Sequence, residues 1–373
     1  MLLMYKLMRF LLKNTIRMKI RNVVIFVFLI CLFACKKDRE TVVDDNKKYV
    51  KLLWRNKPFD WTPTTLVVKS KMLYFGDLHR NFYAVNLENA KVKLKFKSDY
   101  NPFYKPLIDG QDLFLADYNA ELSCFDSLGK LKWQVNGEMN LRKDLAENGN
   151  YIYGSVQGNG FSKLNKKDGK VVWYLPKDSN ITETNEPEFF ENRVYLGLSE
   201  HDAKLLAIDN KSGKNIWENK YKKYSNLNQI KTEKGLLVCL NKDFKQGEIL
   251  MLDYETGNEI WSESFNCDVF YEPCVANKSI ILSTYDSKVV SVNIENGKTN
   301  WVLDLKNDQV ESKIISFKGN IYFGTMNRNL YSLNIKAGKI NFVQQFYYGI
   351  STPIVEDNKI YFPTGGSEMW ILK

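Results

Sequence analysis

The 373-residue sequence predicts an all-β protein, an eight-bladed β-propeller of four-stranded antiparallel blades. Three observations lead to this prediction. Apolar and polar residues alternate with the period of strands. A segment of about 40 residues recurs along the chain, which is the length of a four-stranded propeller blade. The chain also begins and ends partway through a repeat, so that its two ends together complete one blade.

The stretch IYFGTMNRNLYSLNIKAGKINF illustrates the repeat. Its apolar residues Ile321 and Phe323, and then Tyr331, Leu333 and Ile335, stand at alternate positions, which predicts two strands. In NIKAG a glycine follows four residues after an asparagine, which is typical of a tight hairpin with a positive φ and a bulge. A third strand then returns, and a short apolar strand lies upstream. The unit therefore has four strands.

The same template fits seven times. The hairpin glycine recurs as Gly129, Gly169, Gly213, Gly257, Gly297 and Gly338, with Ala90 in the first copy. Four residues after each comes a large apolar residue, at intervals of 39, 40, 44, 44, 40 and 41 residues. We interpret this series as packing between blades: Leu94, Trp133, Trp173, Trp217, Trp261, Trp301 and Phe342.

An eighth blade is divided between the two ends of the sequence. ISTPIVEDNK and IYFPTGGSEMWILK supply three strands and end at Lys373, and YVKLLW supplies the fourth, with Trp54 placed 40 residues before Leu94. The N-terminal strand should therefore complete the C-terminal blade and close the ring. Closure protects the strand edges that would otherwise pair with other chains. The predicted propeller spans residues 48–373.

Residues 1–34 have the features of a lipoprotein signal peptide. They carry six basic residues and no acidic one, and the apolar run Val23–Leu32 is short for a membrane span. The segment from Met18 already forms a complete signal, so Met18 is a candidate for the true start. LFAC at its end resembles a lipobox, which makes Cys35 the candidate lipidation site and 35–47 a tether. An uncleaved membrane anchor is the alternative.

The charge of the chain argues against a nucleic-acid partner. The net charge is +10, and removal of the six basic residues of the leader lowers it to 10 − 6 = +4. The other cysteines lie mostly in apolar strand patterns, where a small buried hydrophobe is the ordinary role. We expect free thiols at Cys124 and Cys239, and also at Cys267 and Cys274, although the last two could pair in an oxidising compartment.

Catalytic and metal-binding motifs are not evident. The two histidines, His79 and His201, fall in equivalent loops between the second and third strands of blades 1 and 4. A metal site needs three or four converging ligands, and no CxxC or HExxH pattern accompanies them. We therefore predict no metal ligand and no catalytic residue. The basic segment NKYKKYSN is either a solvated loop or a contact for an anionic partner.

The closures such as LYSLNIKAGKINF resemble the pyrroloquinoline-quinone-type propeller repeat, and the resemblance runs from about residue 48 to the end. With a lipobox and eight blades, the chain is similar to the lipoprotein of the outer-membrane β-barrel assembly machinery. That resemblance implies a non-catalytic scaffold for a protein partner. The quinoprotein dehydrogenases of this family use a vicinal cysteine pair beside the quinone. No two cysteines are adjacent here, so no cofactor is expected.

The sequence thus predicts a scaffold anchored by lipid to the outer membrane, at its periplasmic face or on the cell surface. The alternative is a surface lipoprotein that binds a carbohydrate or a toxin, and a quinoprotein-type enzyme is a third interpretation. Binding residues are expected in loops on the face that holds the inter-blade connections, where sequence length varies most. The candidates are His79, Arg80, His201, Lys242, Phe244, Lys245 and Arg328.

Overall fold

The computed structural model describes residues 47–55, 66–77, 79–98, 104–116, 121–135, 145–155, 160–175, 183–184, 186–199, 202–242, 246–267 and 269–373. These segments belong to the unit Asn46–Lys373. The predicted signal peptide, Cys35 and the tether up to residue 46 lie outside the described residues. Within the described segments, no helix is long and apolar enough to cross a membrane.

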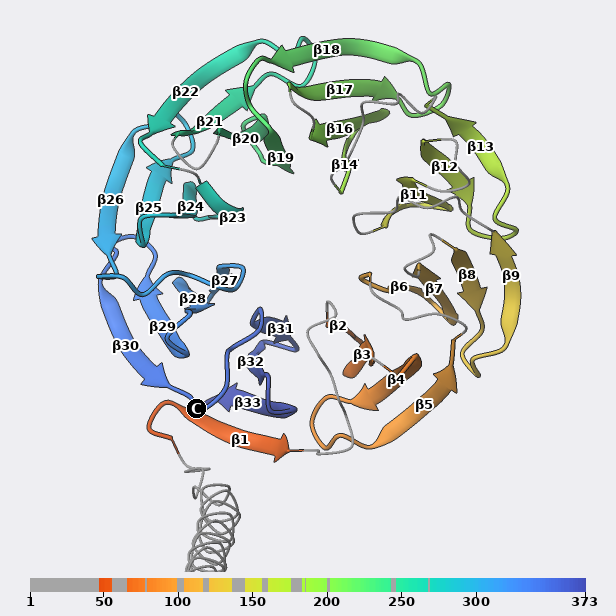
Figure 1. Ribbon diagram of the computed structural model, residues 1–373, viewed down its shortest axis with the longest axis horizontal. Coiled ribbons are helices and arrows are strands. Elements are labelled where there is room, and N and C mark those ends of the chain that lie inside the picture. The colour runs from red at the N-terminus through yellow and green to blue at the C-terminus, as the bar shows by residue number, and fades with distance from the viewer. Residues whose placement is uncertain are drawn as a thin grey trace, which may run out of the picture. The chain divides into compact units, whose positions relative to one another are not determined.

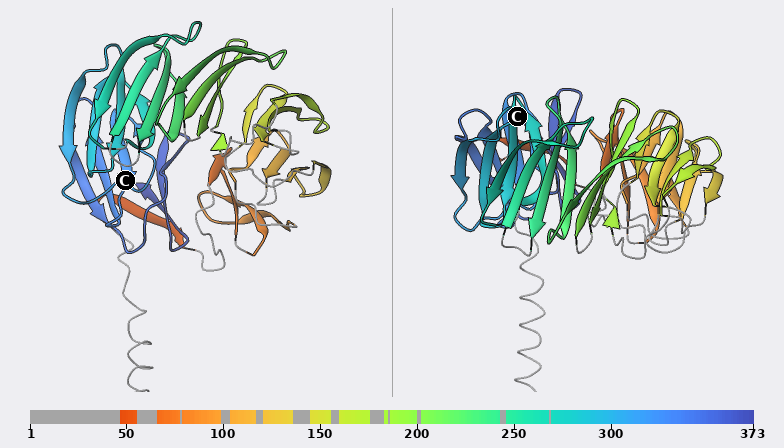
Figure 2. Two further views of the ribbon diagram at one scale, coloured as in Figure 1. Left: turned by 45° about the horizontal axis from the view of Figure 1, so that its top comes forward. Right: turned by 90° about the horizontal axis from the view of Figure 1, so that it is seen from above.

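Eight antiparallel sheets stand around a common axis, which confirms the predicted eight-bladed β-propeller. We number the blades in chain order from β2. Within each blade the first strand lies nearest the axis and the last lies on the outside (Figure 1). The strands run across the thickness of the ring, so that the turns lie on its two faces (Figure 2).

The first four blades are built as follows. Blade 1 contains β2 (Val67–Lys69), β3 (Met72–Gly76), β4 (Asn81–Asn86) and β5 (Val92–Lys97). Blade 2 contains β6 (Leu107–Asp109), β7 (Asp112–Ala116), β8 (Leu122–Phe125) and β9 (Leu131–Val135). Blade 3 contains β10 (Ala146–Asn148), β11 (Tyr151–Ser155), β12 (Phe161–Asn165) and β13 (Val171–Tyr174). Blade 4 contains β14 (Glu183–Thr184), β15 (Glu188–Phe190), β16 (Arg193–Ser199), β17 (Ala203–Asp209) and β18 (Asn215–Tyr221).

The other four blades repeat this plan. Blade 5 contains β19 (Asn226–Lys231), β20 (Leu236–Lys242), β21 (Gln246–Leu252) and β22 (Glu259–Phe265). Blade 6 contains β23 (Val269–Ala276), β24 (Ser279–Thr284), β25 (Lys288–Asn293) and β26 (Thr299–Asp304). Blade 7 contains β27 (Ile315–Phe317), β28 (Asn320–Gly324), β29 (Asn329–Asn334) and β30 (Ile340–Gln345). Blade 8 contains β31 (Ile354–Glu356), β32 (Lys359–Thr364), β33 (Glu368–Leu372) and β1 (Val50–Arg55).

Blade 4 differs from the prediction of four strands, because its innermost strand is in two pieces. Both β14 and β15 pair with β16, at opposite ends of that strand. Pro187 stands directly before β15 and has no N–H to donate to a ladder. The innermost edge therefore restarts after the proline.

The two ends of the chain close the ring as predicted. Strand β1 pairs antiparallel with β33, with Val50 opposite Leu372 and Trp54 opposite Met369. The ladder continues past the strand ends, since the backbone N–H of Lys373 donates to the carbonyl of Tyr49 over 3.0 Å. The outermost strand of blade 8 is thus the first strand of the chain.

The core lies between blades rather than inside any one sheet. Cys239 of β20 and Ile280 of β24 share one buried cluster, and Ile281 of β24 and Phe323 of β28 share the next. Because each blade packs between two neighbours, its second strand is buried on both faces, and β24 is buried along its whole length. The alternation of apolar and polar residues is therefore clearest on the outermost strands, which face solvent on one side.

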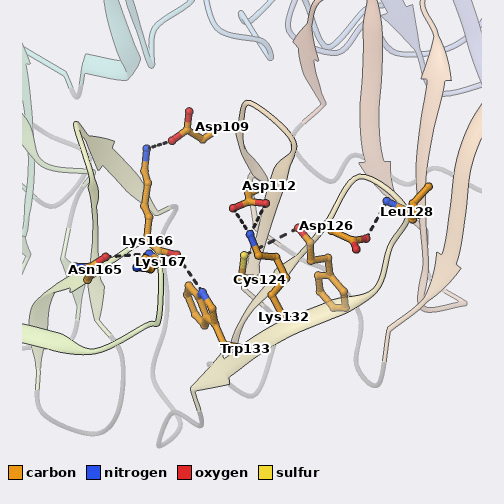
Figure 3. A network of polar contacts seen from close by, with 11 residues as sticks. Asp109, Asp112, Cys124, Asp126, Leu128, Lys132, Trp133, Asn165, Lys166 and Lys167 are labelled. Atoms are coloured by element: carbon orange, nitrogen blue, oxygen red, sulfur yellow. Dashed lines mark hydrogen bonds and ion pairs between the residues drawn. The ribbon is translucent and has the colours of Figure 1, made fainter.

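Six of the eight junctions between blades are joined at their outer edge by a tryptophan, while Leu94 and Phe342 occupy this position in the other two. In the junction of blades 2 and 3, the Trp133 indole N–H donates to the carbonyl of Lys166 over 3.0 Å (Figure 3). The Lys166 ammonium in turn contacts Asp109 of blade 2 at 2.7 Å. The same indole-to-carbonyl bond joins Trp54 to Leu87, Trp173 to Asn210, Trp217 to Tyr254, Trp261 to Ile294 and Trp301 to Ile335.

The hairpin glycines are explained by the same contact. Gly213 has a φ of +72°, and a Cβ built on it would lie 2.8 Å from the Trp173 ring of the preceding blade. Its N–H donates to the carbonyl of Asp209, four residues earlier, over 2.8 Å. A glycine is favoured here because the turn needs a left-handed residue and the neighbouring indole leaves no room for a side chain.

The junction of blades 7 and 8 is built differently, because the outermost pair of blade 8 has no hairpin. Here Phe342 replaces the tryptophan and stacks on Tyr49, with ring centroids 4.2 Å apart and an interplanar angle of 9°. A phenyl ring has no N–H to donate, so stacking takes the place of the indole bond.

The four described cysteines, Cys124, Cys239, Cys267 and Cys274, are free thiols. The question left open by the sequence for Cys267 and Cys274 is thus answered in favour of unpaired thiols. Burial raises the pKa of Cys124 to about 11. The buried thiols of Cys124 and Cys239 serve as small packing groups in the core.

Candidate partner-binding face

The turns between the second and third strands of the blades share a face with the inter-blade connections, as the sequence indicated. In blade 1 the carbonyl of Arg80 accepts the N–H of Ser98, which follows β5, over 2.9 Å. In blade 7 the carbonyl of Arg328 accepts the N–H of Phe346, which follows β30, over 2.9 Å. The structure therefore brings exposed Arg80 and Arg328 to equivalent positions on this face, together with exposed His79.

These turns are held by buried carboxylates. In blade 1 Asp77 is 3 % exposed, and its Oδ1 accepts the backbone N–H groups of His79 at 2.8 Å and Asn81 at 2.9 Å. Burial alone would raise the pKa of Asp77, but hydrogen bonds from Asn81, Tyr83 and His79 outweigh it and lower the pKa. The turn that presents His79 and Arg80 is thus fixed by an ionised side chain.

In blade 7 the carboxylate that holds the turn comes from a different segment of the chain. Asp308 comes from the connection between blades 6 and 7, and it is 4 % exposed. Its Oδ1 accepts the N–H of Asn327 at 3.1 Å, and its Oδ2 accepts the Asn329 amide at 2.8 Å. The inter-blade connection and the turn that carries Arg328 are therefore one rigid surface.

The other predicted residues do not join this cluster in the described part of the chain. His201, Phe244 and Lys245 lie outside the described residues. Lys242 is the last residue of β20 and pairs with Gln246 of β21. The extra residues of blade 5 therefore lengthen the paired strands β20 and β21, which have seven residues each.

The same face carries exposed apolar residues that the sequence analysis did not select. Met326 is 61 % exposed, Tyr347 52 %, Tyr285 48 % and Tyr348 39 %. Tyr285 and Met326 occupy the same position in the turns of neighbouring blades 6 and 7, and the two other tyrosines lie on the connection that follows β30. We call these four residues, with Arg328, the rim patch.

Several contacts hold Arg328, Tyr347 and Tyr348 of the rim patch in place. The Arg328 guanidinium donates to the carbonyl of Tyr347 over 2.8 Å. The Tyr347 and Tyr348 rings meet edge to face, with centroids 4.9 Å apart. Gly366, in the corresponding turn of blade 8, lies so close to Tyr348 that a Cβ there would be 2.2 Å from the ring. Exposed side chains held in this way lose little conformational freedom when a partner binds.

A signal for the rim patch was present in the sequence. Tyr285 in the turn TYDSK and Met326 in the turn TMNRN occupy equivalent positions. The other residues of both turns are polar. An alignment of the turns of successive blades therefore indicates both residues. The contribution of Tyr347 and Tyr348 could not be found in this way, because the connection between blades 7 and 8 has no fixed alignment with the turns.

A charged cluster borders Tyr285. Asp286 Oδ1 accepts hydrogen bonds from the Thr284 hydroxyl at 2.5 Å and the Cys267 thiol at 3.2 Å, and its Oδ2 contacts the Lys288 ammonium. Burial alone would raise the pKa of Asp286, but these three partners lower it to about 2. Burial and the Asp286 carboxylate raise the pKa of Cys267, so its thiol stays protonated at neutral pH. Among the described residues, no group of three or more His, Cys, Asp and Glu side chains is placed to hold a metal ion.

Comparison with known proteins gives the family. A family model described as outer membrane protein assembly factor BamB matches residues 51–238 and 231–341. The BamB of Legionella pneumophila is 28 % identical over 112 residues, 27 % of this chain and 28 % of that protein. The BamB of Nitrosomonas eutropha is 22 % identical over 205 residues, 51 % of this chain and 48 % of that protein. The matches thus span less than half the length of either curated relative.

Solved structures agree on the fold. The crystal structure of BamB from Moraxella catarrhalis has a TM-score of 0.69 at 13 % identity, over 87 % of this chain and 99 % of that chain. A europium-containing methanol dehydrogenase has a TM-score of 0.62 at 13 % identity, over 84 % of each chain. At such identities the likeness concerns the architecture alone. The resemblance to the quinone-type repeat that the sequence suggested is confirmed.

Proposed function

The chain belongs to the family of the outer membrane protein assembly factor BamB, and we propose on this premise that it is a protein-binding scaffold in the assembly of outer-membrane proteins. The role requires a rigid body with a surface that holds a partner. The propeller supplies such a body, since it is closed by strand pairing and joined at its rim by the tryptophan bonds.

The observation that carries the proposal is the rim patch. It combines exposed tyrosine, methionine and arginine, the residue types enriched in protein interfaces. We propose that the partner is a subunit of the β-barrel assembly machinery, and that it contacts the rim patch. Exposed His79 and Arg80 lie on the same face and are proposed as secondary contacts, as are His201, Lys242, Phe244 and Lys245.

We further propose that the mature protein is anchored to the outer membrane by lipid on Cys35. The support is the order of basic residues, apolar run and lipobox-like LFAC in residues 1–35. In this arrangement residues 1–34 are removed as a signal peptide and 35–47 tether the propeller. Metabolic labelling with a fatty acid tests the anchor, since Cys35→Ser should abolish the incorporation of label.

The proposed role is non-catalytic, with no quinone and no metal. A quinoprotein-type enzyme is the competing assignment, because the methanol dehydrogenase shares the architecture. The absorbance spectrum of the purified protein tests it. A quinone band that copurifies with the protein would contradict the scaffold assignment.

The main test is affinity purification of the tagged protein from detergent-solubilised membranes, with mass spectrometry of what is recovered. We expect the barrel subunit of the assembly machinery with the native chain. The variant Met326→Ala/Tyr347→Ala/Tyr348→Ala should reduce its recovery by about tenfold or more, because truncation of a single anchor residue of an interface costs about 2 kcal/mol or more and tyrosine is enriched among such anchors.

The control is Leu128→Ala. Leu128 is 84 % exposed and lies in the hairpin between β8 and β9, on the opposite face of the ring, because successive turns of an antiparallel blade alternate in direction. It should leave recovery unchanged. Unchanged recovery with the triple variant would remove the rim patch from the proposal. If the barrel subunit is absent with the native chain, and protease removes the protein from intact cells, the surface-binding lipoprotein is the better assignment.

A further inference from the structure

The outermost strand of blade 1 carries a row of lysines. Strand β5 has the sequence VKLKFK, in which Lys93, Lys95 and Lys97 are exposed while the residues between them are half-buried. Side chains of a strand alternate between its two faces, so the three lysines share the face that is turned to solvent. Lys91, just before the strand, is also exposed.

The charge of this row is not balanced within the described part of the chain. Among the described residues, no ion pair involves Lys93, Lys95 or Lys97. The Lys95 ammonium lies over the Tyr83 ring, 5.1 Å from its centroid, a contact that leaves the positive charge in place. Alternate residues of a strand are about 7 Å apart, so the row presents three positive charges along about 14 Å.

Protection of an open strand edge does not account for the row. Lysines on an edge strand oppose pairing with another chain, and each blade has an outermost strand of this kind (Figure 1). Yet β13 has the sequence VVWY, with no charged residue, and β22 has EIWSESF, with two glutamates and no lysine. Strands β5 and β22 lie on opposite sides of the ring (Figure 1). The outside of the ring therefore has a basic strand on one side and an acidic strand on the other.

The adjoining blade 8 extends the basic surface and carries the first described residues of the chain. Lys48 before β1 and Lys51 within it are exposed. The Trp54 indole of β1 donates to the carbonyl of Leu87, in the hairpin that leads to β5, so the two outermost strands belong to blades in contact. We call the exposed lysines of this side the basic flank: Lys48, Lys51, Lys91, Lys93, Lys95 and Lys97.

We propose that the basic flank docks on an anionic lipid surface, with the propeller standing on its edge. The choice of a lipid surface rests on the anchor proposed above at Cys35. Lys47, the first described residue, is 47 − 35 = 12 residues from that cysteine, and an extended chain of this length spans at most about 43 Å. An anchor there would keep blade 8 within this distance of the bilayer, and the basic flank decides which side of the ring meets it.

The electrostatics favour this orientation over others. Each lysine near an anionic membrane contributes a factor of about five in affinity, so the three lysines of β5 favour the docked orientation by about a hundredfold. The attraction acts within the Debye length, about 8 Å at physiological ionic strength, and therefore depends on the side of the ring that is turned to the lipid. The glutamates of β22 would be repelled. Docking on the edge leaves the rim patch, which lies on a face, open to a partner subunit.

The test is lysine footprinting of the full-length protein in vesicles of phosphatidylcholine, with or without phosphatidylglycerol. Lysines are acetylated briefly, and mass spectrometry gives the rate at each residue. We expect phosphatidylglycerol to slow acetylation of Lys93, Lys95 and Lys97 by about fivefold or more. Salt at about 1 M, where the Debye length is about 3 Å, should restore it. Lys220, 63 % exposed on β18 of blade 4, is the internal reference and should react equally in both vesicles.

A variant shows whether the row itself makes the contact. Phosphatidylglycerol should also slow acetylation of Lys51 and Lys91 in the native protein. Lys93→Gln/Lys95→Gln/Lys97→Gln removes the charges of β5 but leaves these two reporters, and we expect their protection to be lost.

The matched control variant is Lys211→Gln/Lys214→Gln/Lys220→Gln. It removes the same number of exposed lysines from blade 4, away from the basic flank, and should leave the protection of Lys51 and Lys91 unchanged. The melting temperature of each variant confirms that it is folded.

Flotation of the vesicles separates this proposal from that of the anchor. Native protein that floats with both kinds of vesicle is anchored, whatever its lysines do. Equal acetylation of the basic flank in the two kinds would then overturn the docking alone, as would protection of Lys51 and Lys91 that survives the β5 variant. Native protein that floats only with phosphatidylglycerol, and only while the row is intact, would support the docking and contradict the anchor. Protein that floats with neither would overturn both.

An acidic protein segment is the competing occupant of the basic flank. Acetylation in native cell membranes distinguishes it from lipid. Lysines of the flank that are protected there, but react freely in vesicles with phosphatidylglycerol, would assign the surface to a protein partner and overturn the lipid assignment.

Discussion

Arg55 and Glu368 join the two ends of the chain by an ion pair. The Arg55 Nε donates to the Glu368 Oε1 over 2.8 Å, across the β1 and β33 ladder in which the two residues are direct partners. Glu368 is only 2 % exposed and also accepts from the Thr364 hydroxyl and the Trp370 indole, each at 3.0 Å. The closure of the ring thus depends on a buried carboxylate as well as on backbone pairing.

Removal of this carboxylate should destabilise the ring. Glu368→Ala leaves three donors without their acceptor, so we expect a loss of about 3–5 kcal/mol in the free energy of unfolding. Urea denaturation followed by tryptophan fluorescence measures it. The control is Glu88→Ala, which removes an exposed ion pair with Lys359 and should cost less than about 1 kcal/mol. Equal losses for the two variants would contradict a special role of Glu368.

The hairpin glycines should be intolerant of a side chain because of the adjacent tryptophan. Gly213→Ala introduces a Cβ 2.8 Å from the Trp173 ring at a φ of +72°, and we expect a loss of about 2–4 kcal/mol. Gly319→Ala is the matched control, since its φ is +76° but nothing lies within 4 Å of the added Cβ. It should lose only about 1 kcal/mol. The difference between the two variants measures the packing part alone.

The indole hydrogen bonds between blades should add to the stability that burial of the tryptophan ring provides. Trp261 is 9 % exposed and donates to the carbonyl of Ile294 over 3.0 Å. Trp261→Phe leaves that carbonyl unpaired and should lower the free energy of unfolding by about 1–3 kcal/mol, and Trp261→Ala by about 3–5 kcal/mol. Val302→Ala, on an exposed site of β26, should change it by less than about 0.5 kcal/mol. A phenylalanine variant as stable as the native chain would show that the bond adds nothing.

The pH dependence of stability should report the charge of Glu188. Its pKa is about 6 in the folded protein and near 4.5 in the unfolded chain, so the folded state binds more protons between these values. Stability therefore falls as the pH rises from about 4.5 to about 6, by about 1–2 kcal/mol after allowance for solvent screening. Glu188→Gln should remove this fall and be more stable than the native chain near pH 7.5.

Urea midpoints measured at intervals between pH 4 and pH 8 test this expectation. The comparison of the two chains cancels the contribution of the other titrating groups. A native chain and a Glu188→Gln variant with parallel pH profiles would contradict the raised pKa.

Much of the fold could be predicted because the sequence repeats one local pattern of strands and turns. The hairpin glycine recurs in six repeats, with Ala90 in its place in the first, and a large apolar residue follows four positions later in all seven. The N-terminal strand fills the place left in the last blade. The exceptions have local causes that the pattern does not contain. Pro187 interrupts the innermost edge of blade 4, and the extra length of blade 5 goes largely into β20 and β21.

The candidate sites were less predictable. The sequence placed His79, Arg80 and Arg328 on the face of the inter-blade connections, where the structure has them, because the order of turns in a meander is fixed by the order of strands. Of the rim patch it selected Arg328 alone, since the exposure of Tyr347 and Tyr348 depends on how the last connection folds over blade 8.

The sequence alone determined the blade number, the strand order and the closure, because these follow from period, spacing and the polarity of each strand. The tertiary structure decided which charges meet on the axis. Glu186, Glu188 and Glu272 are brought together with Lys105 and Lys313 from four different blades. Their distances depend on the curvature of the ring, and local pattern contains no information about it. The raised pKa of Glu188 is therefore a property of the closed propeller.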